Sequence, residues 1–128
     1  MDLNLVFKRL LLLDFLIITL ILLSAIFIPE SSTVANFNSN MSEISNIVYI
    51  FVLIWLVIFY LSIYLLFKFK TLGKQLYLVS FLLACLLNIL MGPIAMDEWV
   101  YLADTFSSVL AGAILVLLYF SPLKKKFG

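Results

Sequence analysis

Four long apolar runs, separated by short polar connections, constrain this 128-residue chain more than any other feature. Each run approaches the roughly 20 residues that a helix needs to cross the hydrocarbon core of a bilayer. Hydrophobic residues make up 66% of the chain and charged residues 12%, whereas soluble domains carry roughly half apolar and about a quarter charged residues. A soluble monomer of this composition could not cover its apolar surface. The sequence therefore predicts an all-α integral membrane protein.

The runs and their connections use up the chain, so we expect a single four-helix transmembrane domain over residues 1–128. The predicted spans are about 8–28, 45–67, 72–92 and 103–121. Prolines follow the first, third and fourth runs, and proline cannot continue the hydrogen bonding of a helix.

The starts of the second and fourth helices are less sharply marked than their ends. Asn40 precedes Glu43 at the spacing of a capping box, which could start the second helix outside the bilayer. Asp97 and Asp104 are both candidate N-caps for the fourth helix. A short interfacial helix from Asp97 to Ala103, leading into the span, would reconcile these two starts.

The basic residues favour one orientation, because short loops rich in lysine and arginine stay in the cytoplasm. They form three groups, before the first span, between the second and third, and after the fourth: Lys8, Arg9, Lys68, Lys70, Lys74, Lys124, Lys125 and Lys126. The other two loops carry only acidic charges. We expect two tandem hairpins in a bacterial inner (cytoplasmic) membrane, with both termini cytoplasmic.

A cleaved signal peptide is the main alternative for the first run, because Lys8 and Arg9 resemble a basic n-region. The run is longer than the usual 7 to 15 apolar residues and contains Asp14, which favours a retained span. The Asn40-Met41-Ser42 triplet has the form of a glycosylation acceptor, but such triplets also arise by chance.

Several classes of function are disfavoured by the residues that the chain lacks. Histidine is absent, and with it the commonest metal ligand and general base. There is no zinc-binding spacing and no glycine-rich phosphate loop. Cys85 is the only cysteine, and its apolar neighbours predict an inert, buried thiol. We therefore expect that the protein is not an enzyme and uses no metal or cofactor. We also expect no nucleic-acid partner, because the basic residues form no extended stripe.

Asp14 is the acid that falls inside a predicted span, near its cytoplasmic end. Intramembrane acids are costly and commonly serve as proton carriers, cation sites or partners of a basic residue. Its expected partner is one of the lysines between the second and third spans (Lys68, Lys70 or Lys74) or the hydroxyl of Tyr77. Two interpretations of Asp14 are open. It either forms a structural pair that fixes the first helix or has a role in transport.

Small and polar residues recur at helical spacing on the third and fourth runs. They are Ser80, Ala84, Asn88 and Gly92 on the third, and Ala103, Ser107, Ser108, Ala111 and Gly112 on the fourth. Such stripes let helices approach closely, so we expect these two faces to meet and a bulky residue at Gly112 to disrupt them. Alternatively, Asn88 and Ser107 or Ser108 line a hydrophilic cavity that opens outward.

The second run is rich in aromatic residues, among them Trp55, Tyr60 and Tyr64. These three lie inside the predicted span, where their polar groups need partners. An aromatic face could hold an apolar or cationic ligand, whereas ordinary packing is the simpler interpretation.

The leading hypothesis for function is a non-catalytic membrane protein that acts through helix contacts. It would serve as an accessory or regulatory subunit of a larger membrane assembly, or associate with itself, with lipid and other membrane subunits as its partners. The alternative is a small proton- or cation-coupled transporter that uses Asp14.

Overall fold

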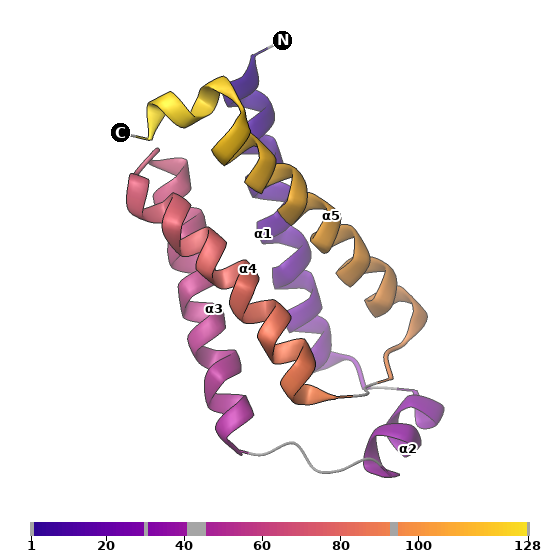
Figure 1. Ribbon diagram of the computed structural model, residues 1–128. Coiled ribbons are helices and arrows are strands. Elements are labelled where there is room, and N and C mark those ends of the chain that lie inside the picture. Colours follow the sequence, from indigo (N-terminus) through magenta and orange to yellow (C-terminus); the bar gives the residue numbers. More distant parts are fainter. Residues whose placement is uncertain (1, 30, 41–45, 93–94, 128) are drawn as a thin grey trace.

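The computed structural model describes residues 2–29, 31–40, 46–92 and 95–127, and all its regular elements there are helical (Figure 1). The four long helices are α1 (Leu3–Phe27), α3 (Asn46–Phe67), α4 (Thr71–Met91) and α5 (Glu98–Phe120). The short α2 (Ser32–Asn40) lies between α1 and α3, and the 3-10 segment η1 (Pro122–Lys126) follows α5. The long helices have 21 to 25 residues, or about 32 to 38 Å at 1.5 Å per residue. All four are long and apolar enough to cross a membrane, as predicted.

The helices differ from those predicted in three respects. The first helix begins five residues early, at Leu3, because the side chain of Asp2 accepts a hydrogen bond from the Asn4 backbone N–H at 3.0 Å. The separate short helix from Asp97 to Ala103 was a wrong prediction, since α5 runs without a break from Glu98. The helix α2 was not predicted. The Asn40 to Glu43 spacing and the Asn40-Met41-Ser42 triplet extend outside the described residues.

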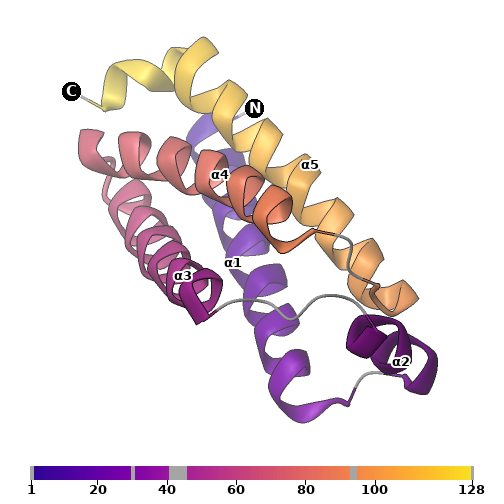
Figure 2. The same cartoon turned by 60° about the horizontal axis from the view of Figure 1, so that its bottom comes forward.

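The long helices associate as two close pairs, α3 with α4 and α1 with α5 (Figures 1 and 2). Contacts between α1 and α3, and between α4 and α5, are sparser. The helices of the predicted tandem hairpins are therefore not the most closely packed pairs. The two close pairs lie against each other and leave a space between them toward one end.

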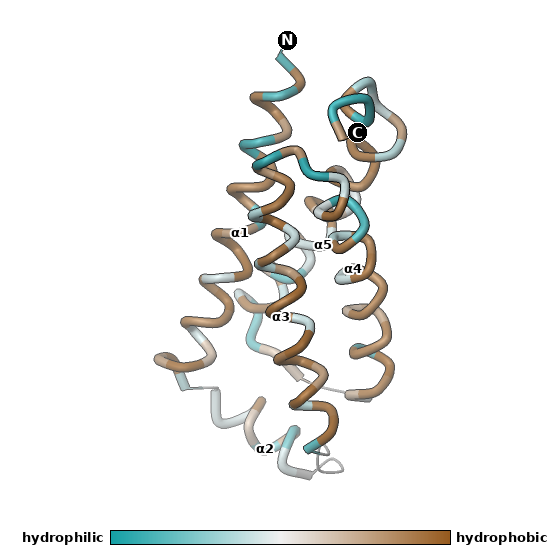
Figure 3. Tube along the Cα trace, turned by 90° about the vertical axis from the view of Figure 1, so that its left-hand side faces the viewer, coloured by the Kyte–Doolittle hydropathy of each residue, from teal (hydrophilic) through white to brown (hydrophobic). Residues whose placement is uncertain are grey.

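Both termini lie at the same end of the bundle, here named the termini end (Figure 1). Polar residues gather at this end and around α2, while the middle of each long helix is hydrophobic (Figure 3). The 3-10 segment η1 folds back over the termini end. As a result, Phe127 packs edge to face on Phe7, with ring centroids 5.9 Å apart. The buried core fills the bundle there: Phe7, Leu11, Phe59, Ile63, Leu66, Tyr77, Ile114, Leu118, Leu123 and Phe127.

The opposite end, here named the α2 end, is joined by backbone and side-chain hydrogen bonds. The Asn38 side-chain amide donates to the Ala95 carbonyl at 3.2 Å and accepts from the Ala95 N–H at 2.9 Å. The Ser31 N–H donates to the Asp97 carboxylate at 3.3 Å. Asp97 makes no side-chain bond to its own helix, so the predicted N-cap instead links α5 to the segment before α2.

A tight turn between α3 and α4 explains their close packing. Phe69 adopts a positive φ of 53°, which reverses the chain and lets the Lys70 N–H reach the Leu65 carbonyl at 3.0 Å. Gly73 then passes against α3. A Cβ added at Gly73 would lie 2.7 Å from the Leu65 Cβ and 2.8 Å from the Leu66 backbone nitrogen, so this contact requires glycine.

Candidate functional site

Asp14 lies near the middle of α1, about 16 Å along the helix from Leu3 at 1.5 Å per residue. The helix extends further before Asp14 than the predicted span, because α1 begins at Leu3. The side chain is only 1% exposed. The Tyr77 hydroxyl of α4 donates to its Oδ2 at 2.7 Å, and the Ser107 hydroxyl of α5 donates to its Oδ1 at 3.2 Å. The carboxylate thus joins three helices through neutral donors.

Of the four partners named from the sequence, Tyr77 is the residue that bonds Asp14. Two of the three lysines instead contact aromatic rings. Lys74 lies over the Tyr119 ring at 4.3 Å from its centroid, and Lys68 lies over the Tyr64 ring at 5.8 Å. Both contacts are toward the termini end, because Lys68 follows the end of α3 and Lys74 is in the first turn of α4.

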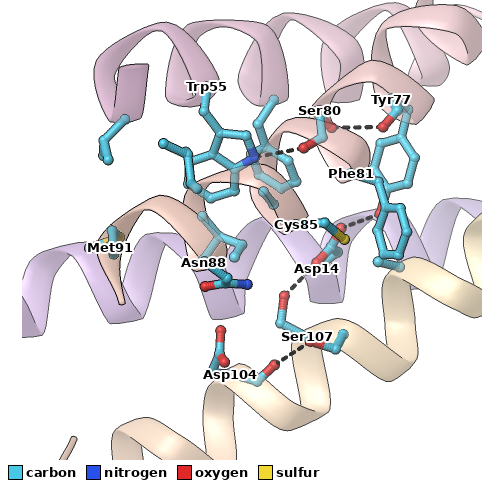
Figure 4. A pocket seen from close by; sticks show the side chains of 17 residues that line it. Asp14, Trp55, Tyr77, Ser80, Phe81, Cys85, Asn88, Met91, Asp104 and Ser107 are labelled. Carbon is cyan, nitrogen blue, oxygen red and sulfur yellow. Dashed lines mark hydrogen bonds between the residues drawn. The ribbon is translucent and has the colours of Figure 1, made fainter. Parts of the chain in front are cut away.

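A partly open cavity of about 290 Å³ lies beside Asp14, between the two helix pairs (Figure 4). Residues from α1, α3, α4 and α5 line it, and the packed core closes it toward the termini end. Its polar wall consists of Asp14, Ser80, Asn88, Asp104, Ser107 and Ser108. Asn88 from α4 and Asp104 from α5 face each other across the cavity (Figure 4). The polar groups therefore run from exposed Asp104 to buried Asp14.

The α3 side of the cavity is aromatic. Trp55 donates its indole N–H to the Ser80 carbonyl at 3.0 Å, which satisfies the polar group of the ring. Its ring stacks on Phe59, with centroids 5.7 Å apart, and Phe59 in turn contacts Tyr77. Phe81 of α4 adds a further aromatic ring to the wall. The hydrogen bond and the ring contacts orient Trp55 and Phe59 on this wall.

The stripes of small residues on α4 and α5 line the cavity instead of meeting. Ser80, Ala84 and Ala111 are on its wall, together with the polar members Asn88, Ser107 and Ser108. A Cβ added at Gly112 would have no neighbour within 4 Å, so the expected close crossing at that glycine is wrong. Gly92 ends α4 with a φ of 68°. The alternative expectation, a hydrophilic cavity near Asn88 and Ser107, agrees with this geometry.

The two tyrosines singled out on α3 lie away from the cavity. The Tyr60 hydroxyl shares a hydrogen bond of 3.0 Å with the Thr19 hydroxyl of α1. Tyr64 is 58% exposed at the outer surface of the bundle. Cys85 was expected to be buried, but its side chain is exposed and lies on the lining of the cavity.

The place of Asp104 on the cavity wall was not predicted from the sequence, which indicated this residue only as a candidate N-cap. It lies inside α5, and its backbone carbonyl accepts a hydrogen bond from the Ser108 hydroxyl at 3.1 Å. Its spacing to Ser107, Ser108 and Ala111 is three, four and seven residues, which places all four on one helix face. That periodicity was the available signal for a polar wall.

The arrangement can bind or exchange a cation or proton at a carboxylate that the helices hold in place. Among the described residues, no group of three or more acidic or thiol side chains is placed to hold a metal ion. The cavity wall has two acidic side chains and no lysine or arginine. Its field therefore favours positive charge.

No protein-family model matches the chain, and no curated protein or solved structure shows significant similarity to it. The class that the fold defines is an all-helical bundle with four helices long and apolar enough to cross a membrane. A proposal for the function of this protein therefore rests on the chemistry of the cavity.

Proposed function

We propose that this protein is a small proton- or cation-coupled membrane transporter in which Asp14 is the coupling residue. The observation that carries the proposal is the Asp14 carboxylate, 1% exposed, on the wall of a cavity of about 290 Å³ within the bundle. Tyr77 and Ser107 hold one carboxylate oxygen each. A carboxylate has about four acceptor positions, so these two bonds leave capacity for a proton or a bound cation.

The choice of an acid at this position supports transport over simple helix association. An asparagine could accept a hydrogen bond from one of these hydroxyls and donate to the oxygen of the other, without the cost of burying a charge in an apolar environment. The carboxylate adds the ability to change charge or to bind a cation. It also stands at the boundary between the cavity and the packed core that includes Leu11, Leu66 and Ile114.

The proposed setting is a bacterial inner membrane, with the termini end in the cytoplasm and the α2 end outside. The lysines and Arg9 lie in the segments at the termini end, in agreement with the positive-inside tendency. In this orientation the cavity faces outward, and the core beneath Asp14 closes the cytoplasmic side.

Reporter fusions test this orientation. We expect fusions after Lys74 and Lys126 to report a cytoplasmic location, and fusions after Asn38 and Met96 an exterior one. Paired alkaline phosphatase and green fluorescent protein fusions at each position give opposite signals and control for expression. A cytoplasmic signal after Asn38 or Met96 would rule out the four-span arrangement.

Proton flux tests the transport proposal directly. We expect proteoliposomes with the wild-type protein to dissipate an imposed pH gradient faster than empty liposomes, as read by an entrapped pH-sensitive dye with valinomycin and potassium clamping the potential. The reason is that Asp14 can take up a proton from the cavity and release it after a conformational change. If flux matches that of empty liposomes, with and without added organic cations, transport through this protein is refuted.

A second candidate is the contact role, as an accessory subunit or a self-associating bundle. Its support is that Asp14 joins α1, α4 and α5, while Tyr60 and Thr19 join α3 and α1, which is how polar groups hold helices together. Purification in mild detergent from native membranes separates the two candidates. A stoichiometric partner protein would favour the contact role.

A further inference from the structure

We propose that the cavity is a binding site for a small organic cation, an ammonium group attached to an apolar or aromatic body. This inference rests on the proposed transport function and names its class of substrate. It is carried by the chemistry of the cavity wall, which combines acidic groups, an ordered aromatic side and limited volume.

The charges on the wall select for a cation. Asp14 and Asp104 stand on the wall, and none of its other residues is charged. Bound anions would therefore be repelled, and neutral molecules without a hydrogen-bond donor would gain nothing from either carboxylate. Asn88, facing Asp104, offers the partial negative charge of its amide oxygen to a cationic group at the same level (Figure 4).

The aromatic side selects for an organic cation over a metal ion. Trp55 and Phe59 are stacked on the α3 side, and Phe81 lies on α4. Ring faces attract an ammonium group and also pack on apolar groups. A hard metal cation instead requires six or more oxygen ligands, and no suitable acidic cluster is found in the described part of the chain.

The size of the cavity limits the ligand. A volume of about 290 Å³ is near the lower end of small-molecule pockets, which span roughly 300 to 1,000 Å³. Exposed Asn88, Ser108 and Asp104 mark the access route between α4 and α5, toward the α2 end. At the termini end this seam is closed, because the Tyr119 hydroxyl donates to the Lys74 carbonyl.

Cys85 gives a direct assay, because it is the only cysteine, is exposed, and lies at the cavity margin. The protein in lipid nanodiscs is alkylated with N-ethylmaleimide in the presence of benzyltrimethylammonium. Neopentylbenzene, its uncharged carbon isostere, and benzenesulfonate serve as matched controls. We expect the cation alone to slow alkylation, with an affinity reduced about tenfold or more in Asp14→Asn, since the charge attraction between the carboxylate and the quaternary ammonium group is lost.

Fluorescence of Trp55 provides an independent measurement. The chain has two tryptophans, and Trp99 lies in a separate small cavity, so Trp99→Phe leaves Trp55 as a reporter. We expect benzyltrimethylammonium to change this fluorescence saturably, and Asp104→Asn to weaken the effect. The proposed site would be overturned if the cation and its neutral isostere had equal effects. It would also be overturned if the cation had no effect in both assays. Proton flux without cation binding would leave transport standing and refute this site, whereas cation binding without flux would support the site and refute transport.

Discussion

Asp14→Asn is expected to abolish proton- or cation-coupled flux, reducing it to the level of empty liposomes, while the protein still folds. The amide cannot exchange a proton or carry negative charge, so coupling is lost. It still accepts a hydrogen bond from one of the two hydroxyls, Tyr77 or Ser107. The loss of stability should therefore be modest, on the order of 1 kcal/mol. Flux in proteoliposomes and unfolding in mixed micelles with dodecyl sulfate measure the two effects.

Two further variants make this prediction specific. Asp14→Glu keeps a carboxyl group at a shifted position and should retain part of the flux. Thr19→Val removes another polar group of α1, whose partner Tyr60 lies outside the cavity, and should leave flux unchanged. If Asp14→Asn keeps full flux, or if it costs several kcal/mol of stability and Asp14→Glu does not rescue flux, the residue is structural and the transport proposal is wrong.

Gly73→Ala is expected to destabilise the bundle by about 1 to 3 kcal/mol, the usual cost of overpacking a close contact. The added Cβ would lie 2.7 Å from the Leu65 Cβ, 2.8 Å from the Leu66 nitrogen and 2.9 Å from the Leu65 carbonyl carbon. Two of these three atoms belong to the backbone, so no side-chain rotation relieves the overlap. The α3 and α4 helices must move apart at the turn.

Gly112→Ala is the matched control for this substitution. Its Cβ would have no heavy atom within 4 Å, and alanine favours a helix over glycine by up to about 1 kcal/mol. We expect it to be neutral or slightly stabilising under the same unfolding conditions. Equal stability of the two alanine variants would contradict the close packing of α3 on α4.

The amino-acid sequence was sufficient to predict four long apolar helices and most of their ends. Apolar runs of about 20 residues with prolines after them can satisfy their backbone groups in lipid only as helices. The position of Asp14 among these residues, and Tyr77 as one of its candidate partners, also followed from spacing along single helices. These are local properties, which depend on neighbours within a few turns.

Only the tertiary structure decided which helices pair and where space remains between them. The turn at Phe69 and the contact at Gly73 bring α3 onto α4, and the stripes on α4 and α5 are left to line a cavity. From the sequence, a stripe of small residues predicts a close crossing and a cavity wall equally well, because both need short side chains on one face. The bond from Ser107 to Asp14 and the place of Asp104 opposite Asn88 depend on how separate helices are shifted and rotated. That geometry is set by packing across the whole bundle, and no periodicity within one helix encodes it.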